Sequence, residues 1–247
     1  MSVDVSKPGA SVPVHRVRFV DWSPSAITAL ALSPVAWTES AAAGRSVLAI
    51  GRDNGNIDLC TWCEGQSGSI AQGWSPVWTL LGEENYKIES LAFTASASHL
   101  RLFSTSGGSI VSEHFLPSSL TGQQAADTRT PTRTLSSHGG AIWSMAASPT
   151  GKFLAIGCED GVVRLIDVAG DAFEHVGTGM HVAPRMTRVA SRILSLAWGP
   201  PRRQMATSND SDDDNDDAWH DTYLLGGLGN STAAVWDVPT GQLRSRL

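Results

Sequence analysis

Short apolar segments alternate along this chain with clusters of turn residues, and the same order of segments occurs four times. The clearest copy has apolar segments at 141–146, 152–157 and 162–168, with a turn at 159–161. Alternating Val, Leu and Ile residues predict strands, and Gly beside Asp or Asn predicts a tight turn with positive φ. We therefore expect each copy to hold three antiparallel strands, followed by a fourth strand before the next copy.

Applied to the whole chain, this pattern predicts four sheets of four strands. The first three strands of each sheet are expected at 27–32, 47–50 and 57–62; at 88–93, 100–104 and 110–115; at 141–146, 152–157 and 162–168; and at 193–198, 223–226 and 232–237. The outer strands are expected at 77–81, 132–135, 174–177 and 242–244. The turn between second and third strands, here called the corner, is expected at 53–55, 107–108, 159–161 and 229–230. Within each corner a two-residue turn is expected, in which Gly or Asn supplies the positive φ.

Repeats of several strands at a period of tens of residues are typical of β-propellers. Glycines 55, 108 and 161 recur about every 53 residues, and Trp236-Asp237 is the dipeptide that names the WD40 repeat. The predicted fold class is all-β, a WD40-type β-propeller with about four blades of an incomplete ring that has seven blades in typical WD40 proteins. We expect a flexible segment at 1–13, then blades one to four over 14–247, with 14–20 as the outer strand that closes the ring. The chain is then an N-terminal part of a longer protein.

Composition places the chain among ordinary globular proteins. Apolar residues make up 41% and charged residues 17% of the 247 residues, and nine are Trp. The first residues lack the apolar centre of a secretory signal, and no segment approaches the roughly 18 apolar residues of a membrane span. Three Cys, an odd number, indicate a reducing compartment rather than a disulfide framework. We expect an intracellular protein with no membrane partner.

A complete WD40 blade links a His, a corner Asp, a strand Ser or Thr and a Trp through hydrogen bonds. The third copy keeps His138 and Asp160, but Ile156 and Ile166 stand in the other two places. Stability should therefore depend on apolar packing. The positions expected to serve the repeat structurally are His138, Asp160, Gly161, Trp236, Asp237, Asp53 and Gly55.

Charge is distributed unevenly. An acidic run at 209–217 predicts a disordered loop over about 207–221, or alternatively an acidic arm that engages a basic partner. Cations cluster on both sides of the predicted strand 193–198. The candidate contacts for RNA phosphates or an acidic protein segment are Arg185, Arg188, Arg192, Arg202 and Arg203.

Catalytic and metal motifs give no positive signal. Cys60 and Cys63 have C-x-x-C spacing, but residues three apart on a strand point to opposite faces, so a structural role is favoured over redox or zinc chemistry. Asn230-Ser231-Thr232 fits a glycosylation acceptor by chance. The chain has no nucleophile elbow, phosphate-binding loop, dinucleotide fingerprint or H-E-x-x-H motif. We predict no enzyme activity, no catalytic residues, no cofactor and no metal.

Two segments carry a more specific resemblance. Residues 14–19 with 22–27, and residues 140–149 with 157–161, resemble the cirhin family, nucleolar WD40 proteins of the small-subunit processome. The resemblance implies a scaffold subunit in the nucleus and nucleolus that works in ribosome biogenesis and supports pre-rRNA transcription and processing and 18S rRNA maturation. It implies other WD40 and scaffold proteins of the processome as partners, with pre-rRNA or U3 small nucleolar RNA bound directly or through proteins.

Two other functions remain open at this point. The first is a generic WD40 adaptor in another complex, such as a ubiquitin ligase or a chromatin complex. The second is a propeller hydrolase, which would need converging carboxylates, His or metal ligands near the axis; the predicted inner strands offer mainly Ile, Leu, Ala, Ser and Trp.

Overall fold

Four antiparallel sheets of four strands each make up most of the described part of the chain. The computed structural model describes residues 25–34, 46–63, 73–82, 86–95, 100–116, 133–176, 186–203 and 219–247, and every regular element in these ranges is a strand. The first sheet contains β1 (Ile27–Leu32), β2 (Val47–Arg52), β3 (Ile57–Cys63) and β4 (Gly73–Leu80); the second contains β5 (Ser90–Ala95), β6 (Leu100–Thr105), β7 (Ile110–Phe115) and β8 (Arg133–Ser136). The third contains β9 (Ile142–Ala147), β10 (Phe153–Cys158), β11 (Val163–Asp167) and β12 (Glu174–His175); the fourth contains β13 (Ile193–Trp198), β16 (Tyr223–Leu228), β17 (Ala233–Asp237) and β18 (Leu243–Arg246).

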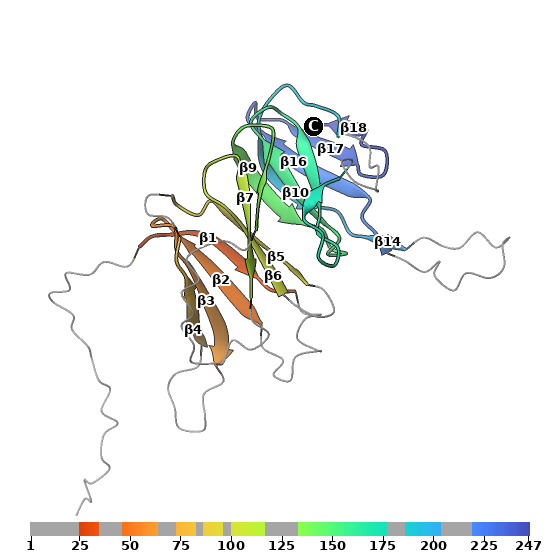
Figure 1. Ribbon diagram of the computed structural model, residues 1–247. Coiled ribbons are helices and arrows are strands. Elements are labelled where there is room, and N and C mark those ends of the chain that lie inside the picture. Colours follow the sequence, from red (N-terminus) through yellow and green to blue (C-terminus); the bar gives the residue numbers. More distant parts are fainter. Residues whose placement is uncertain are drawn as a thin grey trace, which may run out of the picture.

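The sheets follow one another in chain order (Figure 1). The first strand of each sheet contacts the first strand of the next, from β1 to β5, β9 and β13. Consecutive sheets that meet along their first strands are the blades of a propeller, so the predicted all-β, incomplete WD40-type β-propeller is confirmed.

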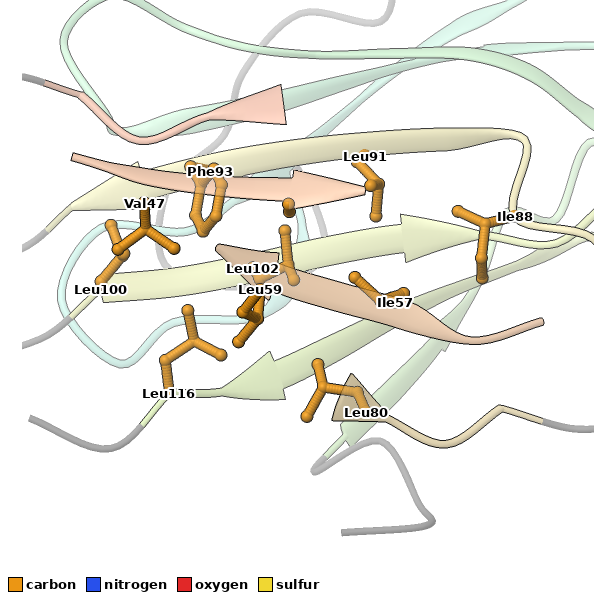
Figure 2. Close-up of a cluster of buried hydrophobic side chains, with 11 residues drawn as sticks. Val47, Ile57, Leu59, Leu80, Ile88, Leu91, Phe93, Leu100, Leu102 and Leu116 are labelled. Atoms are coloured by element: carbon orange, nitrogen blue, oxygen red, sulfur yellow. The ribbon is translucent and has the colours of Figure 1, made fainter. Parts of the chain in front are cut away.

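The core lies between the blades, in three clusters. Figure 2 shows the first, where Val47 and Leu59 of the first blade meet Phe93 and Leu102 of the second. The other two clusters lie between blades two and three and between blades three and four. Each fully buried Leu or Phe contributes about 1.5–3 kcal/mol, so blade-to-blade packing carries much of the stability.

Strand bounds depart from the predicted ones where a residue serves a connection. β5 begins at Ser90 rather than at 88, because the backbone N–H of Ile88 donates to Arg52 in the first blade at 3.0 Å. β4 begins at Gly73, and a register shift between Leu59 and Cys60 accommodates Pro76, which has no N–H to donate.

The corners of the first, third and fourth blades hold three residues, at 53–55, 159–161 and 229–231, and so differ from the expected two-residue turn. In the third blade, the N–H of Gly161 donates to the carbonyl of Cys158 at 3.2 Å, and Gly161 has a φ of 76°. A turn closed in this way and followed by one residue with positive φ is the three-residue hairpin loop. In the fourth blade the positive φ falls on Ser231, one residue beyond the expected 229–230 corner, whereas in the second blade it falls on Gly107, inside the expected 107–108 corner.

A two-stranded ribbon extends from the fourth blade, built from β14 (Arg202–Arg203) and β15 (Trp219–His220). The predicted acidic loop over about 207–221 therefore ends earlier than expected. Its last residue, Asp221, is buried and accepts hydrogen bonds from the backbone and hydroxyl of Thr150. Residues 204–218 lie outside the described part of the chain, as do the predicted segments 1–13 and 14–20.

Candidate interaction surface

The strand order separates two faces of the propeller. The corners, and the connections that lead into each first strand, lie at one edge of the blades, which we call the corner face. For example, the N–H of Gly229 in a corner donates to the carbonyl of Arg192, which precedes β13, at 3.0 Å. The connections between first and second strands lie at the other edge, the opposite face.

Asp160 is held in the corner of the third blade by Arg164. The guanidinium donates to both carboxylate oxygens, at 3.1 and 2.7 Å, and also to the backbone carbonyl of His138 at 3.1 Å. Burial opposes ionisation of Asp160, but the hydrogen bonds from Arg164 and from the Val162 N–H outweigh it, so the pKa of this carboxyl lies below its usual value. The corner therefore carries a fixed negative charge that is already neutralised.

His138 does not brace this corner through its ring. The residue has a φ of 55°, its side chain is exposed, and its ring lies 5.3 Å from that of His175. Its backbone carbonyl is what reaches the corner, through Arg164. Sequence reasoning missed Arg164; the only signal was a cation on the strand that follows the corner, four residues after Asp160.

The Trp of the repeat is replaced in three blades. Strand registers pair Leu224 with Trp236, and they pair the matching leucines of the other blades with Cys60, His114 and Ile166. Trp236 is fully buried and donates its indole N–H to the carbonyl of Thr187 at 2.8 Å. The adjacent Asp237 accepts hydrogen bonds from the Thr240 hydroxyl and from Arg244. Both bonds lower the pKa of the Asp237 carboxyl, the bond from Thr240 more than the bond from Arg244.

His114 forms a buried pair with Ser104. Its Nε2 lies 2.8 Å from the Ser104 hydroxyl, and burial lowers its pKa to about 4. Ser104 is only 2% exposed, so its hydroxyl lies within the blade. Within the described residues, no group of three or more His, Cys, Asp or Glu side chains could hold a metal ion.

The remaining predicted positions lie in the first blade. Gly55 has a φ of 86°, as its corner requires, and the N–H of Asp53 donates to the carbonyl of Ala26 at 3.0 Å. Cys60 is buried, which raises the pKa of its thiol. The side chain of Cys63 lies outside the described part.

The candidate arginines do not form one patch. Arg188 and Arg192 precede β13 and lie on the corner face, whereas Arg202 and Arg203 follow it and lie on the opposite face. A strand of this length separates its ends by about 17 Å. The Arg202 guanidinium lies 5.2 Å from the centre of the Tyr223 ring. Arg185 lies outside the described residues.

The corner-face arginines border a hollow between the third and fourth blades. It has a volume of about 350 Å³, and its walls include Glu159, Asp160, Arg188, Ser191 and Arg246. Arg188 is anchored by its Nε, which donates to the Asp160 carbonyl at 2.8 Å. We call this site the corner hollow.

An aromatic residue stands beside the corner hollow. The Arg192 guanidinium lies 5.0 Å from the centre of the exposed Trp143 ring, within range of a cation–π contact. The Trp143 indole N–H donates to the carboxylate of Glu159. The geometry thus offers a charged recognition surface, and it brings no nucleophile and general base together there.

Comparison with known proteins agrees with this architecture. The WD40 family model, described as WD domain, G-beta repeat, matches residues 129–167, which include most of the third blade. The molecule is therefore a propeller protein of the WD40 type. Within the described ranges, no helix has the length and apolar character needed to cross a membrane.

The chain as a whole is similar to one kind of protein in fungi and mammals. It is 31% identical to U3 small nucleolar RNA-associated protein 4 of Schizosaccharomyces pombe over 228 residues, which is 92% of this chain and 26% of the relative. It is 33% identical to the protein of the same name in Saccharomyces cerevisiae over 224 residues, which is 90% of this chain and 23% of the relative. It is 30% identical to the Homo sapiens homolog over 196 residues, which is 79% of this chain and 23% of the relative. The chain thus spans about a quarter of the length of the curated relatives it matches.

Proposed function

We propose that this chain belongs to the cirhin family and is part of a scaffold subunit of the small-subunit processome, located in the nucleolus. The observation that carries the proposal is the similarity, over about nine-tenths of the chain, to relatives named for their association with U3 small nucleolar RNA. The role is geometric: the rigid blades hold connections and corners at fixed spacing, so that several processome proteins bind one molecule at once, with pre-rRNA or U3 RNA bound directly or through them. No residue does chemistry in this role.

The test is affinity purification of the tagged chain from its source cells. We expect U3 RNA to be recovered at least tenfold over an unrelated small RNA, together with other WD40 scaffold proteins, and we expect 18S rRNA precursors to accumulate on depletion. An unrelated WD40 protein of similar size serves as control. Recovery of ubiquitin-ligase or chromatin subunits without U3 RNA would instead support a generic WD40 adaptor.

Contact with RNA through the arginines is tested separately for each face. One variant carries Arg188→Glu with Arg192→Glu, and the other carries Arg202→Glu with Arg203→Glu. Ultraviolet crosslinking of RNA that falls in one variant assigns the contact to that face. Unchanged crosslinking and complex recovery in both would count against RNA contact by these arginines.

We further propose that additional blades cover the two outermost sheets in the native protein. Leu30 and Leu32 of β1 are 61% and 55% exposed, and Leu194 and Leu225 of the fourth blade are 43% and 42% exposed. Sheets inside a propeller bury both faces, so apolar residues exposed at the two outermost faces support an incomplete ring. Hydrogen exchange at β1 and β16 should be slower in protein isolated from its source cells than in the 247-residue chain. Equal exchange rates, or an isolated protein no longer than this chain, would contradict the proposal.

A further inference from the structure

With Arg164 counted, three guanidinium groups stand against two carboxylates at the corner hollow, an excess of one positive charge. Asp160 is neutralised by Arg164, and the Glu159 carboxylate accepts the Trp143 indole N–H. In contrast, the terminal nitrogens of Arg188 and the whole guanidinium of Arg246 donate no hydrogen bond to the described residues, although the charge of Arg188 also acts on the nearby Asp160 carboxylate. Two guanidinium groups, one from the connection before β13 and one from β18, are therefore available to a ligand.

The backbone positions of both arginines are fixed by the fold. The segment that carries Arg188 crosses the third-blade corner, where the Val189 N–H donates to the Gly161 carbonyl at 2.9 Å. Arg246 lies on β18, where it pairs with Ala234. Because both backbones are held in the folded blades, the points at which the two side chains are attached are set before a ligand binds, so binding has to order only the side chains and not the backbone.

We propose that the corner hollow binds an acidic peptide segment of a partner protein, with carboxylates of the peptide paired to Arg188 and Arg246. A guanidinium and a carboxylate form paired, charge-assisted hydrogen bonds, and a volume of about 350 Å³ is at the lower end of known ligand pockets. The inference concerns a protein partner and does not depend on the processome assignment.

Two observations favour a peptide over RNA. The hollow is also lined by Glu159, so a polynucleotide, which carries a charge at every phosphate, would place some of its charges against this carboxylate. A peptide spaces its acidic residues and can present N–H groups to Glu159. In addition, the nearest exposed aromatic ring, that of Trp143, is already covered by Arg192, so a base would have to displace this guanidinium in order to stack.

The experiment is selection from a displayed library of random 12-residue peptides, with the intact chain as bait. We expect the captured peptides to be enriched in Asp and Glu. A selected peptide, once synthesised, should bind at least tenfold more weakly to the double variant Arg188→Glu with Arg246→Glu than to the wild type. The matched control is Arg202→Glu with Arg203→Glu, which makes the same charge change on the opposite face and should leave binding within twofold.

The outcomes separate the alternatives. Peptides without acidic enrichment, or equal loss of binding in the two variants, would overturn the proposal. It would also be overturned if a 12-nucleotide single-stranded RNA bound more tightly than the selected peptide and lost that binding in the Arg188 and Arg246 variant, because the site would then be one for RNA. Because both arginines are exposed, circular dichroism melts of the variants should match the wild type, which confirms that they are folded.

Discussion

Arg101 on β6 pairs with Glu113 on β7 inside the second blade, where the two side chains are 1% and 0% exposed and Nε lies 2.5 Å from Oε1. The terminal nitrogens of Arg101 donate to carbonyl oxygens within 168–172, in the third blade. Arg133 binds the second oxygen of Glu113 at 2.5 Å. A buried charged network therefore joins two blades at the opposite face.

Replacing Glu113 by Ala should lower the free energy of unfolding by about 3–5 kcal/mol, because the buried Arg101 loses its counter-charge. Urea denaturation measures this change. Glu174→Ala removes an exposed carboxylate from β12 and should change the stability by less than about 0.5 kcal/mol. A loss below about 1 kcal/mol for Glu113→Ala would show that the network contributes little.

His114 should make stability fall as the solution becomes acidic. Its folded-state pKa of about 4 lies below the usual 6.5, so the unfolded chain binds the proton first as pH decreases. The stability is present above pH 6.5 and is lost as pH falls toward 4, by up to about 3 kcal/mol from this group. Denaturation between pH 7 and 4 should show a shallower decline for His114→Gln, which does not titrate, whereas His138→Gln should follow the wild type.

Gly161→Ala should destabilise the junction of blades three and four. The residue has a φ of 76°, and an added Cβ would lie 2.3 Å from the Val189 carbonyl oxygen. Gly170 is the matched control, because its φ is 57° but an added Cβ would meet nothing within 4 Å. We expect a loss of about 1–3 kcal/mol for backbone strain in both, with a further loss in Gly161→Ala alone. Equal melting temperatures for the two variants would contradict the role of the close contact.

Trp236 should be the most costly of the repeat positions to truncate. Trp236→Ala removes a fully buried side chain between the last two blades and should cost about 3–5 kcal/mol. Trp236→Phe keeps most of the apolar contact but loses the hydrogen bond to Thr187, so it should cost about 1 kcal/mol beyond the loss of apolar area. Chemical denaturation of both variants measures the loss of unfolding free energy. A larger loss for Trp236→Phe than for Trp236→Ala would contradict the prediction.

The strands were predictable because the alternation of apolar residues reports directly on burial in a sheet. The register of the strands was harder to predict from the sequence. The equal spacing of glycines 55, 108 and 161 suggested equivalent corners, yet in the second blade positive φ falls on Gly107, and the Trp position is filled by His114. A shift of one residue in a corner changes which side chain faces the core, and residue spacing alone cannot detect it.

The candidate surface was only partly predictable, because strand direction separates residues that are close in sequence. Arg192 and Arg202 flank the same strand and therefore lie on different faces. Arg246 was missed because its contribution depends on contact between blades. Buried charges such as Arg101 were also missed, since a charged residue in a strand pattern usually indicates an exposed position.

The walls of the corner hollow come from two blades, and this has a thermodynamic consequence. Glu159 and Asp160 belong to the third blade, while Arg246 belongs to the fourth. Any molecule that binds all of them must favour the docked arrangement over a separated one, by an amount that grows with its concentration. A partner that binds the corner hollow would thus stabilise the contact between the third and fourth blades, and any change that separates these blades would weaken its binding.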